Sequence, residues 1–169
     1  GTEADEVALF IHGTTLGTNA LIERKGAKIA FLTTEGFRDI LEMGHEKRFE
    51  HYDIFMNKPT PLVPRPLRFP VTERMSARGE TLIALDEPGL LKTIEQLKDV
   101  KIEAVAVGLL HAYAHPAHEQ RIREILAAEL PEVTVCLSSE VCPEMREYER
   151  FSTTCANAYI RPLMSGYLQ

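Results

Sequence analysis

Short apolar segments alternate with segments of helical periodicity along most of this chain. The segments with strand character are residues 7–11, 27–33, 104–109 and 133–137. The clearest helical segment is residues 87–99, where Leu90, Leu91, Ile94 and Leu97 recur on one face. Because alternating strands and helices build an α/β layer, we predict a mixed sheet with helices on its faces.

Three further helices are predicted from the same kind of pattern. Residues 34–41 form a short helix that opens behind Thr34. Residues 117–130 form a helix that starts after Pro116 and turns Ile122, Ile125 and Leu126 inward. Residues 152–168 form a last helix, which we expect to be interrupted near Pro162 because proline lacks a backbone donor.

The middle of the chain, residues 45–85, follows a different pattern. Five prolines, at positions 59, 61, 64, 66 and 70, exclude a helix or a central strand and predict an extended connection. Residues 69–75 and 81–85 then flank a turn that contains Gly79, which is typical of a hairpin. We therefore predict one domain over residues 1–169, with residues 45–85 as a Pro-rich connection and hairpin insertion.

Composition excludes several classes of partner. The formal net charge is −6 and the lysines and arginines form no basic stripe, which argues against a nucleic-acid surface. No apolar run reaches membrane-spanning length, and the acidic, polar residues 1–6 do not resemble a signal peptide. The three cysteines have no CxxC spacing, so we expect free thiols in a reducing, cytoplasmic compartment.

A loop rich in glycine and threonine, residues 12–19, joins the first strand to a helix that we expect to end at Gly26. Its glycines permit close approach of a ligand, and its threonines can cap the helix. A helix terminus with hydroxyl groups suits an anion or a carbonyl oxygen, although the same residues could serve only as an ordinary cap. The loop is neither a Walker A loop nor a dinucleotide fingerprint. The candidate ligand-proximal residues are His12, Gly13, Thr14, Thr15 and Asn19.

The histidines between residues 111 and 118 raise the question of a metal site. Imidazole and carboxylate groups suit zinc, and His111, His115, His118 and Glu119 lie close in sequence. However, Pro116 makes His115 look like a helix cap, and a tetrahedral site needs a full ligand set. We therefore expect no metal site here.

Two charged segments are further candidates for an active-site edge. Arg146, Glu147 and Arg150 lie in a charge run that could be a solvated helix face or could hold a carboxylate or phosphate. Arg38 and Asp39 allow the same two interpretations. No Gly-x-Ser-x-Gly motif is present, so the sequence does not support a hydrolase triad.

Segments distributed over nearly the whole chain resemble one known family. The first is His12-Gly13-Thr14-Thr15-Leu16-Gly17-Thr18-Asn19 with the residues up to Gly26. The others are residues 32–44, 62–65, 73–74, 110–111, 116–119, 138–140, 146–150, 153–154 and 157–159. In this order they are similar to the N-terminal domain of the hydantoinase A/oxoprolinase family.

This resemblance implies a fold and an activity. The family resembles one lobe of the actin, sugar-kinase and heat-shock ATPase fold, which is ribonuclease H-like. Its members use ATP to open cyclic amides, with phosphorylation of a substrate carbonyl, and relatives carboxylate ketones. The resemblance therefore implies ATP and Mg as cofactors, a cyclic amide or ketone as substrate, and a B-type polypeptide as partner.

The sequence departs from the family pattern at both ends. Nothing before Val7 resembles the family's phosphate-loop hairpin, and the second nucleotide-binding half is not present after Leu168. We therefore expect the isolated chain to be inactive. The resemblance places the threonine loop near the substrate or the γ-phosphate, but it assigns no individual catalytic role. The alternative is a non-catalytic α/β regulatory or scaffolding module.

Overall fold

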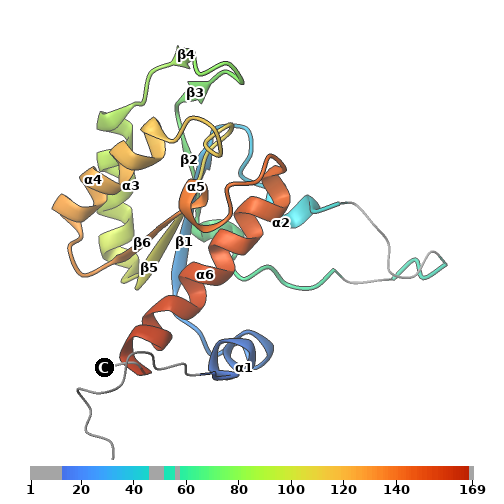
Figure 1. Ribbon diagram of the computed structural model, residues 1–169. Helices are drawn as coiled ribbons and strands as arrows, with labels where there is room; N and C mark the ends of the chain where they lie inside the picture. Colours follow the sequence, from blue (N-terminus) through green and yellow to red (C-terminus); the bar gives the residue numbers. More distant parts are fainter. Residues whose placement is uncertain (1–12, 46–51, 56–57, 168–169) are drawn as a thin grey trace, which may run out of the picture.

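A four-stranded sheet forms the centre of the computed structural model, which describes residues 13–45, 52–55 and 58–167 (Figure 1). The order of its strands is β2-β1-β5-β6. Their bounds are β1 Ile29–Thr34, β2 Arg68–Val71, β5 Ala104–Gly108 and β6 Thr134–Leu137. Helices flank the sheet on both faces, which confirms the predicted fold class.

All three strand pairs in this sheet are parallel. The two central strands, β1 and β5, are buried along their whole length, which explains their nearly continuous apolar character. A mixed sheet would need an antiparallel neighbour, and no described strand of this sheet provides one. The strand expected at residues 7–11 lies outside the described residues.

Strand β2 is an edge strand that the sequence had suggested as the first arm of the hairpin. It pairs with β1, and Pro70 lies opposite Thr33. Proline cannot donate to a sheet ladder, so a position at the edge is the one it can occupy. A 3-10 helix, η2 Arg65–Leu67, precedes it. The hairpin itself is formed by β3 Arg74–Met75 and β4 Thr81–Ile83, with Gly79 at φ +86° in the turn.

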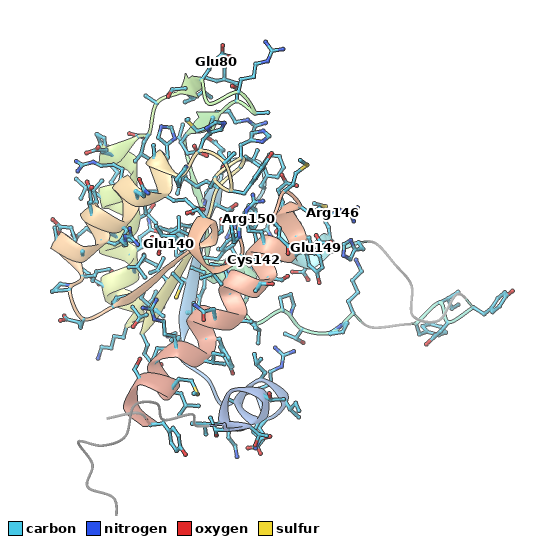
Figure 2. The ribbon with its side chains drawn as sticks, viewed as in Figure 1. Glu80, Glu140, Cys142, Arg146, Glu149 and Arg150 are labelled. Carbon is cyan, nitrogen blue, oxygen red and sulfur yellow. The ribbon has the colours of Figure 1, made fainter. Side chains whose placement is uncertain are left out.

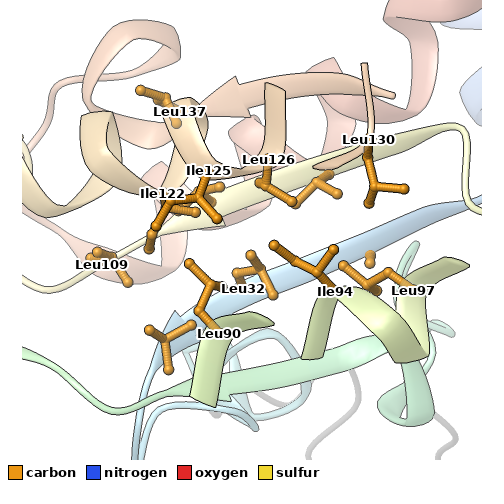
Figure 3. Close-up of a cluster of buried hydrophobic side chains, with 14 of the residues drawn as sticks. Leu32, Leu90, Ile94, Leu97, Leu109, Ile122, Ile125, Leu126, Leu130 and Leu137 are labelled. Carbon is orange, nitrogen blue, oxygen red and sulfur yellow. The ribbon is translucent and has the colours of Figure 1, made fainter. Parts of the chain in front are cut away.

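One face of the sheet is covered by α3 Glu87–Val100 and α4 Ala117–Glu129 (Figure 3). Asp86 caps α3, because its carboxylate accepts a hydrogen bond from Gly89 N at 3.1 Å. The buried residues of this layer include Leu32, Leu90, Ile94, Leu97, Val105, Val107, Ile122, Ile125 and Leu126. The prediction for Leu91 was wrong: its side chain is 42% exposed, on the outer flank of α3.

The other face is covered chiefly by α6 Glu147–Tyr167. This helix begins five residues before the predicted start and continues through Pro162 without interruption. Its residues Phe151, Cys155 and Ala158 are buried against the sheet. We attribute the continuity to this packing, which offsets the loss of one backbone hydrogen bond at proline. The helix is long, but no helix in the described part of the chain is both long and apolar enough to cross a membrane.

Three short helices complete the fold: α1 Leu16–Ile22, α2 Ile40–Met43 and α5 Ser138–Val141. The chain leaves α1 before Gly26, because the left-handed residue is Arg24, at φ +56°. Likewise, the helix expected at residues 34–41 starts only at Ile40, because Gly36 turns the chain at φ +90°. In both cases the helix was predicted but the position of the neighbouring turn was not, because the local sequence does not determine where the chain turns.

Candidate functional site

A buried carboxylate, Glu119, joins the carboxyl ends of the two strands β5 and β6. Glu119 Oε1 accepts hydrogen bonds from Leu109 N at 3.0 Å and Ser138 Oγ at 2.7 Å. Its Oε2 accepts from Ser139 N at 2.9 Å and Ser139 Oγ at 2.7 Å. Burial raises the pKa of the Glu119 carboxyl above its ordinary value, and these hydrogen bonds oppose that shift. Glu119 thus connects the first turn of α4 to the loop after β5 and to the start of α5, which follows β6 directly.

Arg150 lies beside this carboxylate and is itself completely buried. Its guanidinium donates to Ser138 Oγ at 3.2 Å and to the carbonyl of Leu109 at 3.1 Å. It also donates to the carbonyls of Glu144 and Met145, at 2.5 and 3.0 Å. Burial lowers the pKa of Arg150. The solvated-face interpretation therefore does not hold for this residue, because protein acceptors already engage all three of its nitrogens.

A second buried carboxylate, Glu73, lies in the link between β2 and β3. Leu110 N donates to Thr34 Oγ1 at 3.0 Å, and the Thr34 hydroxyl in turn donates to Glu73 Oε1. Glu73 Oε2 lies 2.7 Å from Nδ1 of His118. A carboxylate in this position favours the imidazole tautomer that carries its proton on Nδ1. Glu73 therefore connects the hairpin to β1 and α4.

His111 occupies the loop after β5 in a strained conformation, at φ +58°. Its Nδ1 is buried and has no hydrogen-bond partner among the described residues. Its ring is 6.4 Å from that of Tyr113, which also faces the Arg150 guanidinium at 5.5 Å. Strain and an unpaired polar atom in one residue are features of functional loops.

The histidine group considered as a metal site is dispersed. His118 binds Glu73, whereas Glu119 accepts four hydrogen bonds, from Leu109 after β5 and from Ser138 and Ser139 at the start of α5. His115 Nε2 lies 3.3 Å from the carbonyl of Ala77, so it contacts the hairpin turn and is not the cap of α4, which starts after Pro116. In the described ranges, no three His, Cys, Asp or Glu residues are placed to hold a metal ion.

The threonine loop lies at α1, beside the carboxyl-terminal half of α6 and away from this buried network (Figure 1). His12 lies outside the described residues. Thr14 Oγ1 accepts from Leu16 N at 3.2 Å, and Thr15 Oγ1 accepts from the Asn19 amide at 3.5 Å. Thr15 precedes the helix, but its side chain forms no cap bond, contrary to the capping prediction. Both hydroxyls are exposed.

The other charged candidates are divided between two places. Asp39 accepts from Arg65 Nε at 2.9 Å and Nη2 at 3.1 Å, and this pairing lowers the pKa of Asp39. Arg38 donates to the carbonyl of Arg65 at 2.9 Å. Arg38 and Asp39 therefore hold the Pro-rich connection against α2. Arg146 and Glu147 lie at the start of α6, where Arg146 is exposed (Figure 2).

A pocket of about 360 Å³ lies between α2, the Pro-rich connection and α6. Its lining residues are Arg24, Leu41, Glu42, Met43, Gly44, His45, Lys58, Pro59, Thr60, Pro61, Leu62, Val63, Tyr148, Ser152 and Cys155. Of the charged site candidates, none lines this pocket. The sequence analysis did not predict this pocket. The density of prolines in residues 59–70 indicated an extended connection and gave no sign of a cavity.

Glu73, His118 and Glu119 were not predicted as site residues. A usable signal was present, because polar residues follow strands β1, β2, β5 and β6 at the same edge of the sheet. Parallel sheets bind ligands at this edge, where the carboxyl ends of the strands meet. Fold and network together define an α/β domain with a buried polar layer at the carboxyl ends of its strands.

The chain belongs to the hydantoinase/oxoprolinase family. The model of the family's N-terminal region, described as "Hydantoinase/oxoprolinase N-terminal region", matches residues 1–130. The segments that carry the resemblance in the sequence contribute Thr34, Glu73, His118, Glu119 and Arg150 to the buried polar layer.

Three relatives illustrate the range of the family. Caprolactamase subunit alpha of Pseudomonas jessenii is 40% identical over 95% of this chain and 23% of its own length. Acetophenone carboxylase gamma subunit of Aromatoleum aromaticum is 35% identical over 95% and 24%. 5-Oxoprolinase 1 of Arabidopsis thaliana is 34% identical over 97% and 14%. The chain thus spans at most about a quarter of the length of these relatives.

The fold agrees with a solved structure from the same family. The crystal structure of ATP-dependent caprolactamase from Pseudomonas jessenii superposes with a TM-score of 0.85 at 40% identity. The superposition covers 92% of this chain and 23% of that one. The likeness therefore extends to the arrangement of nearly all the elements described above.

Proposed function

We propose that this chain is the N-terminal part of an ATP-dependent enzyme that opens cyclic amides by phosphorylating the substrate carbonyl. The observation that carries this proposal is the likeness to ATP-dependent caprolactamase, at 40% identity and a TM-score of 0.85. The substrate of such an enzyme would be a lactam or hydantoin ring. An amide carbonyl is a weak electrophile, so coupling to ATP supplies a chemical reason for the nucleotide.

The described residues do not fit a complete site for ATP and Mg. They include neither a phosphate loop nor a group of three acidic or imidazole side chains that could hold a metal ion. Nucleotide binding in this proposal involves other parts of the polypeptide.

This chain would instead contribute groups close to the substrate. Thr14, Thr15 and Asn19 remain our candidates near the substrate or the γ-phosphate, together with His12 and Gly13. Support comes from the exposure of Gly13, Thr14, Thr15 and Asn19 and from the space around Gly13, where an added Cβ would meet no described atom within 4 Å. Arg146 and Glu147 remain candidates for a cleft edge, whereas Arg38, Asp39 and Arg150 already have protein partners.

The partner and the compartment are also proposals. We infer a B-type subunit or domain as partner, because two relatives are named as single subunits of larger enzymes. We infer a cytoplasmic location from three free cysteines, of which Cys136 and Cys155 are buried. We expect neither a nucleic acid nor a membrane as partner.

A second candidate is a subunit of an ATP-dependent ketone carboxylase. The observation in its favour is the 35% identity to acetophenone carboxylase gamma subunit, close to the value for caprolactamase. Both candidates share the activation of a carbonyl group. In the first, water attacks the carbonyl carbon and the ring C–N bond breaks, whereas in the second the carbon next to the carbonyl forms a bond to the carbon of a one-carbon acid.

The test uses the intact protein with its B-type partner. Phosphate release and product formation are measured with caprolactam, 5-oxoproline and hydantoin, and with acetone or acetophenone plus bicarbonate. We expect the ring-opened acid, an amino acid from the lactams and an N-carbamoyl amino acid from hydantoin, in proportion to ADP. A carboxylated ketone as the only product would establish the second candidate. Absence of any substrate-dependent phosphate release would favour the non-catalytic module.

A further inference from the structure

We propose that the pocket between α2, residues 58–63 and α6 binds a small carboxylate that has an aliphatic body. Its volume of about 360 Å³ lies within the usual range of small-molecule pockets. The proposal follows from an apolar floor, a rim that carries uncompensated positive charge, and a polar group on the wall. This binding would occur whether or not the protein opens cyclic amides.

The floor of the pocket is apolar. Val63 and Cys155 are almost completely buried there, and Leu41 and Leu62 pack against the same cluster. Burial raises the pKa of the Cys155 thiol, so this sulfur is a neutral, unreactive part of the lining. Such a surface favours the aliphatic part of a ligand over a fully hydrated ion.

Two cations line the rim, and the backbone positions both. Arg24 donates from Nη2 to the carbonyl of Thr60 at 2.8 Å, and other N–H groups of its guanidinium remain for a ligand. Lys58 Nζ lies 3.4 Å from the carbonyls of Glu42 and Met43. Within the described ranges, neither cation forms an ion pair with a carboxylate.

The carboxylate in the lining does not neutralise this charge. Glu42 Oε2 is 2.7 Å from Nη2 of Arg68, whose side chain is only 1% exposed. A buried arginine needs its partner, so Glu42 remains committed to Arg68. The rim therefore presents a net positive charge above an apolar floor, which suits a carboxylate with an aliphatic chain.

The wall adds one hydroxyl group. The ring of Tyr148 packs against Gly44, where a Cβ atom would lie 3.4 Å from the ring and where φ is +55°. The His45 ring also contacts this ring, edge to face, with centroids 4.8 Å apart. The Tyr148 hydroxyl makes no hydrogen bond within the described ranges and can donate to a carboxylate.

The test measures binding of hexanoate to the intact protein by titration calorimetry. Hexanamide is the control for charge, because it has the same aliphatic chain but is neutral. Acetate is the control for the apolar contact, because it is charged but lacks the chain. We expect hexanoate to bind with a dissociation constant below about 1 mM and hexanamide to bind about tenfold more weakly. Acetate should bind more weakly than hexanoate, because it cannot cover the floor.

Variants locate the binding site. Arg24→Gln and Lys58→Gln should each weaken hexanoate binding about tenfold, and Ser152→Leu should abolish it by filling the pocket. The matched control is Lys25→Gln, since Lys25 is exposed, pairs with Glu23 at 2.8 Å and does not line the pocket. Equal binding of hexanoate and hexanamide, equal effects of the Lys58 and Lys25 changes, or no saturable binding would overturn the proposal. The last result would mean that another part of the polypeptide fills the pocket.

Discussion

The ring of Tyr159 lies so close to Gly26 that a Cβ atom at residue 26 would come within 2.2 Å of two ring carbons. The adjacent Ala27 N donates to the carbonyl of Tyr159 at 2.9 Å. These two contacts hold the link between α1 and β1 against α6. Glycine is required here for close approach and not for a left-handed turn.

Replacing Gly26 by alanine should therefore lower the free energy of unfolding by about 1–3 kcal/mol, because the Tyr159 ring has to move. Urea denaturation of the purified protein measures this change. The control is Gly166→Ala in α6, where an added Cβ meets no described atom within 4 Å and alanine favours the helix. Similar effects of the two substitutions would show that the chain adapts to the added methyl group.

Replacing Glu119 by alanine should lower the free energy of unfolding by about 2–4 kcal/mol. The substitution leaves a cavity and removes the acceptor of four hydrogen bonds from Leu109, Ser138 and Ser139. The matched control is Glu124→Ala on the same helix, where the carboxylate is 65% exposed and pairs with Arg121. If both variants have the same denaturation midpoint, the buried network does not stabilise the fold.

The pH dependence of the Glu119 contribution has a definite sign. Burial raises the pKa of this carboxyl in the folded state above the ordinary value of 4.5. The folded protein then binds the proton more tightly than the unfolded chain. The stabilisation that the protonated Glu119 contributes is therefore fully present below about pH 4.5 and is lost as the pH rises through the folded-state pKa. The cost of Glu119→Ala should therefore decrease from about pH 4 to about pH 7. A cost that increases over this range would show that the hydrogen bonds outweigh burial.

Thr14→Val and Thr15→Val should lower turnover of the intact enzyme about tenfold or more while leaving its fold intact. Both hydroxyls are exposed at the start of α1, and valine keeps the shape while it removes the hydrogen-bonding group. Steady-state kinetics and thermal denaturation test this, with the exposed Thr81→Val in β4 as the control. Wild-type kinetics in both variants would reduce the loop to a structural role.

The isolated 169-residue chain should fold but should not hydrolyse ATP. Phosphoryl transfer depends on positioned donors and a metal ion around the phosphates, and the described residues do not assemble such a group. Calorimetry with ATP and magnesium and a phosphate-release assay test this, with the intact protein and its partner as positive control. Binding at about micromolar concentrations, or sustained phosphate release, would place the nucleotide site within these residues.

The sequence by itself predicted the elements whose signals are local. Strands β1, β5 and β6 appear close to their expected positions. For β1 and β5 the reason is that a strand buried on both faces needs a continuous apolar run. The same holds for α3, where the Asp86 cap and the spacing of Leu90, Ile94 and Leu97 act within a few residues. These features allowed the α/β class to be recognised.

Tertiary contacts decided the rest. Residues 68–71 leave the hairpin for the edge of the main sheet because β1 offers them a parallel partner. Arg150 leaves solvent because acceptors from residues 109, 138, 144 and 145 surround it. Glu73 and Glu119 can be buried because hydrogen-bond partners replace the water around their carboxylates. These partners come from segments up to 45 residues away in the sequence. These partners come together only when the strands align in the folded sheet. Composition and periodicity along the sequence therefore cannot predict them.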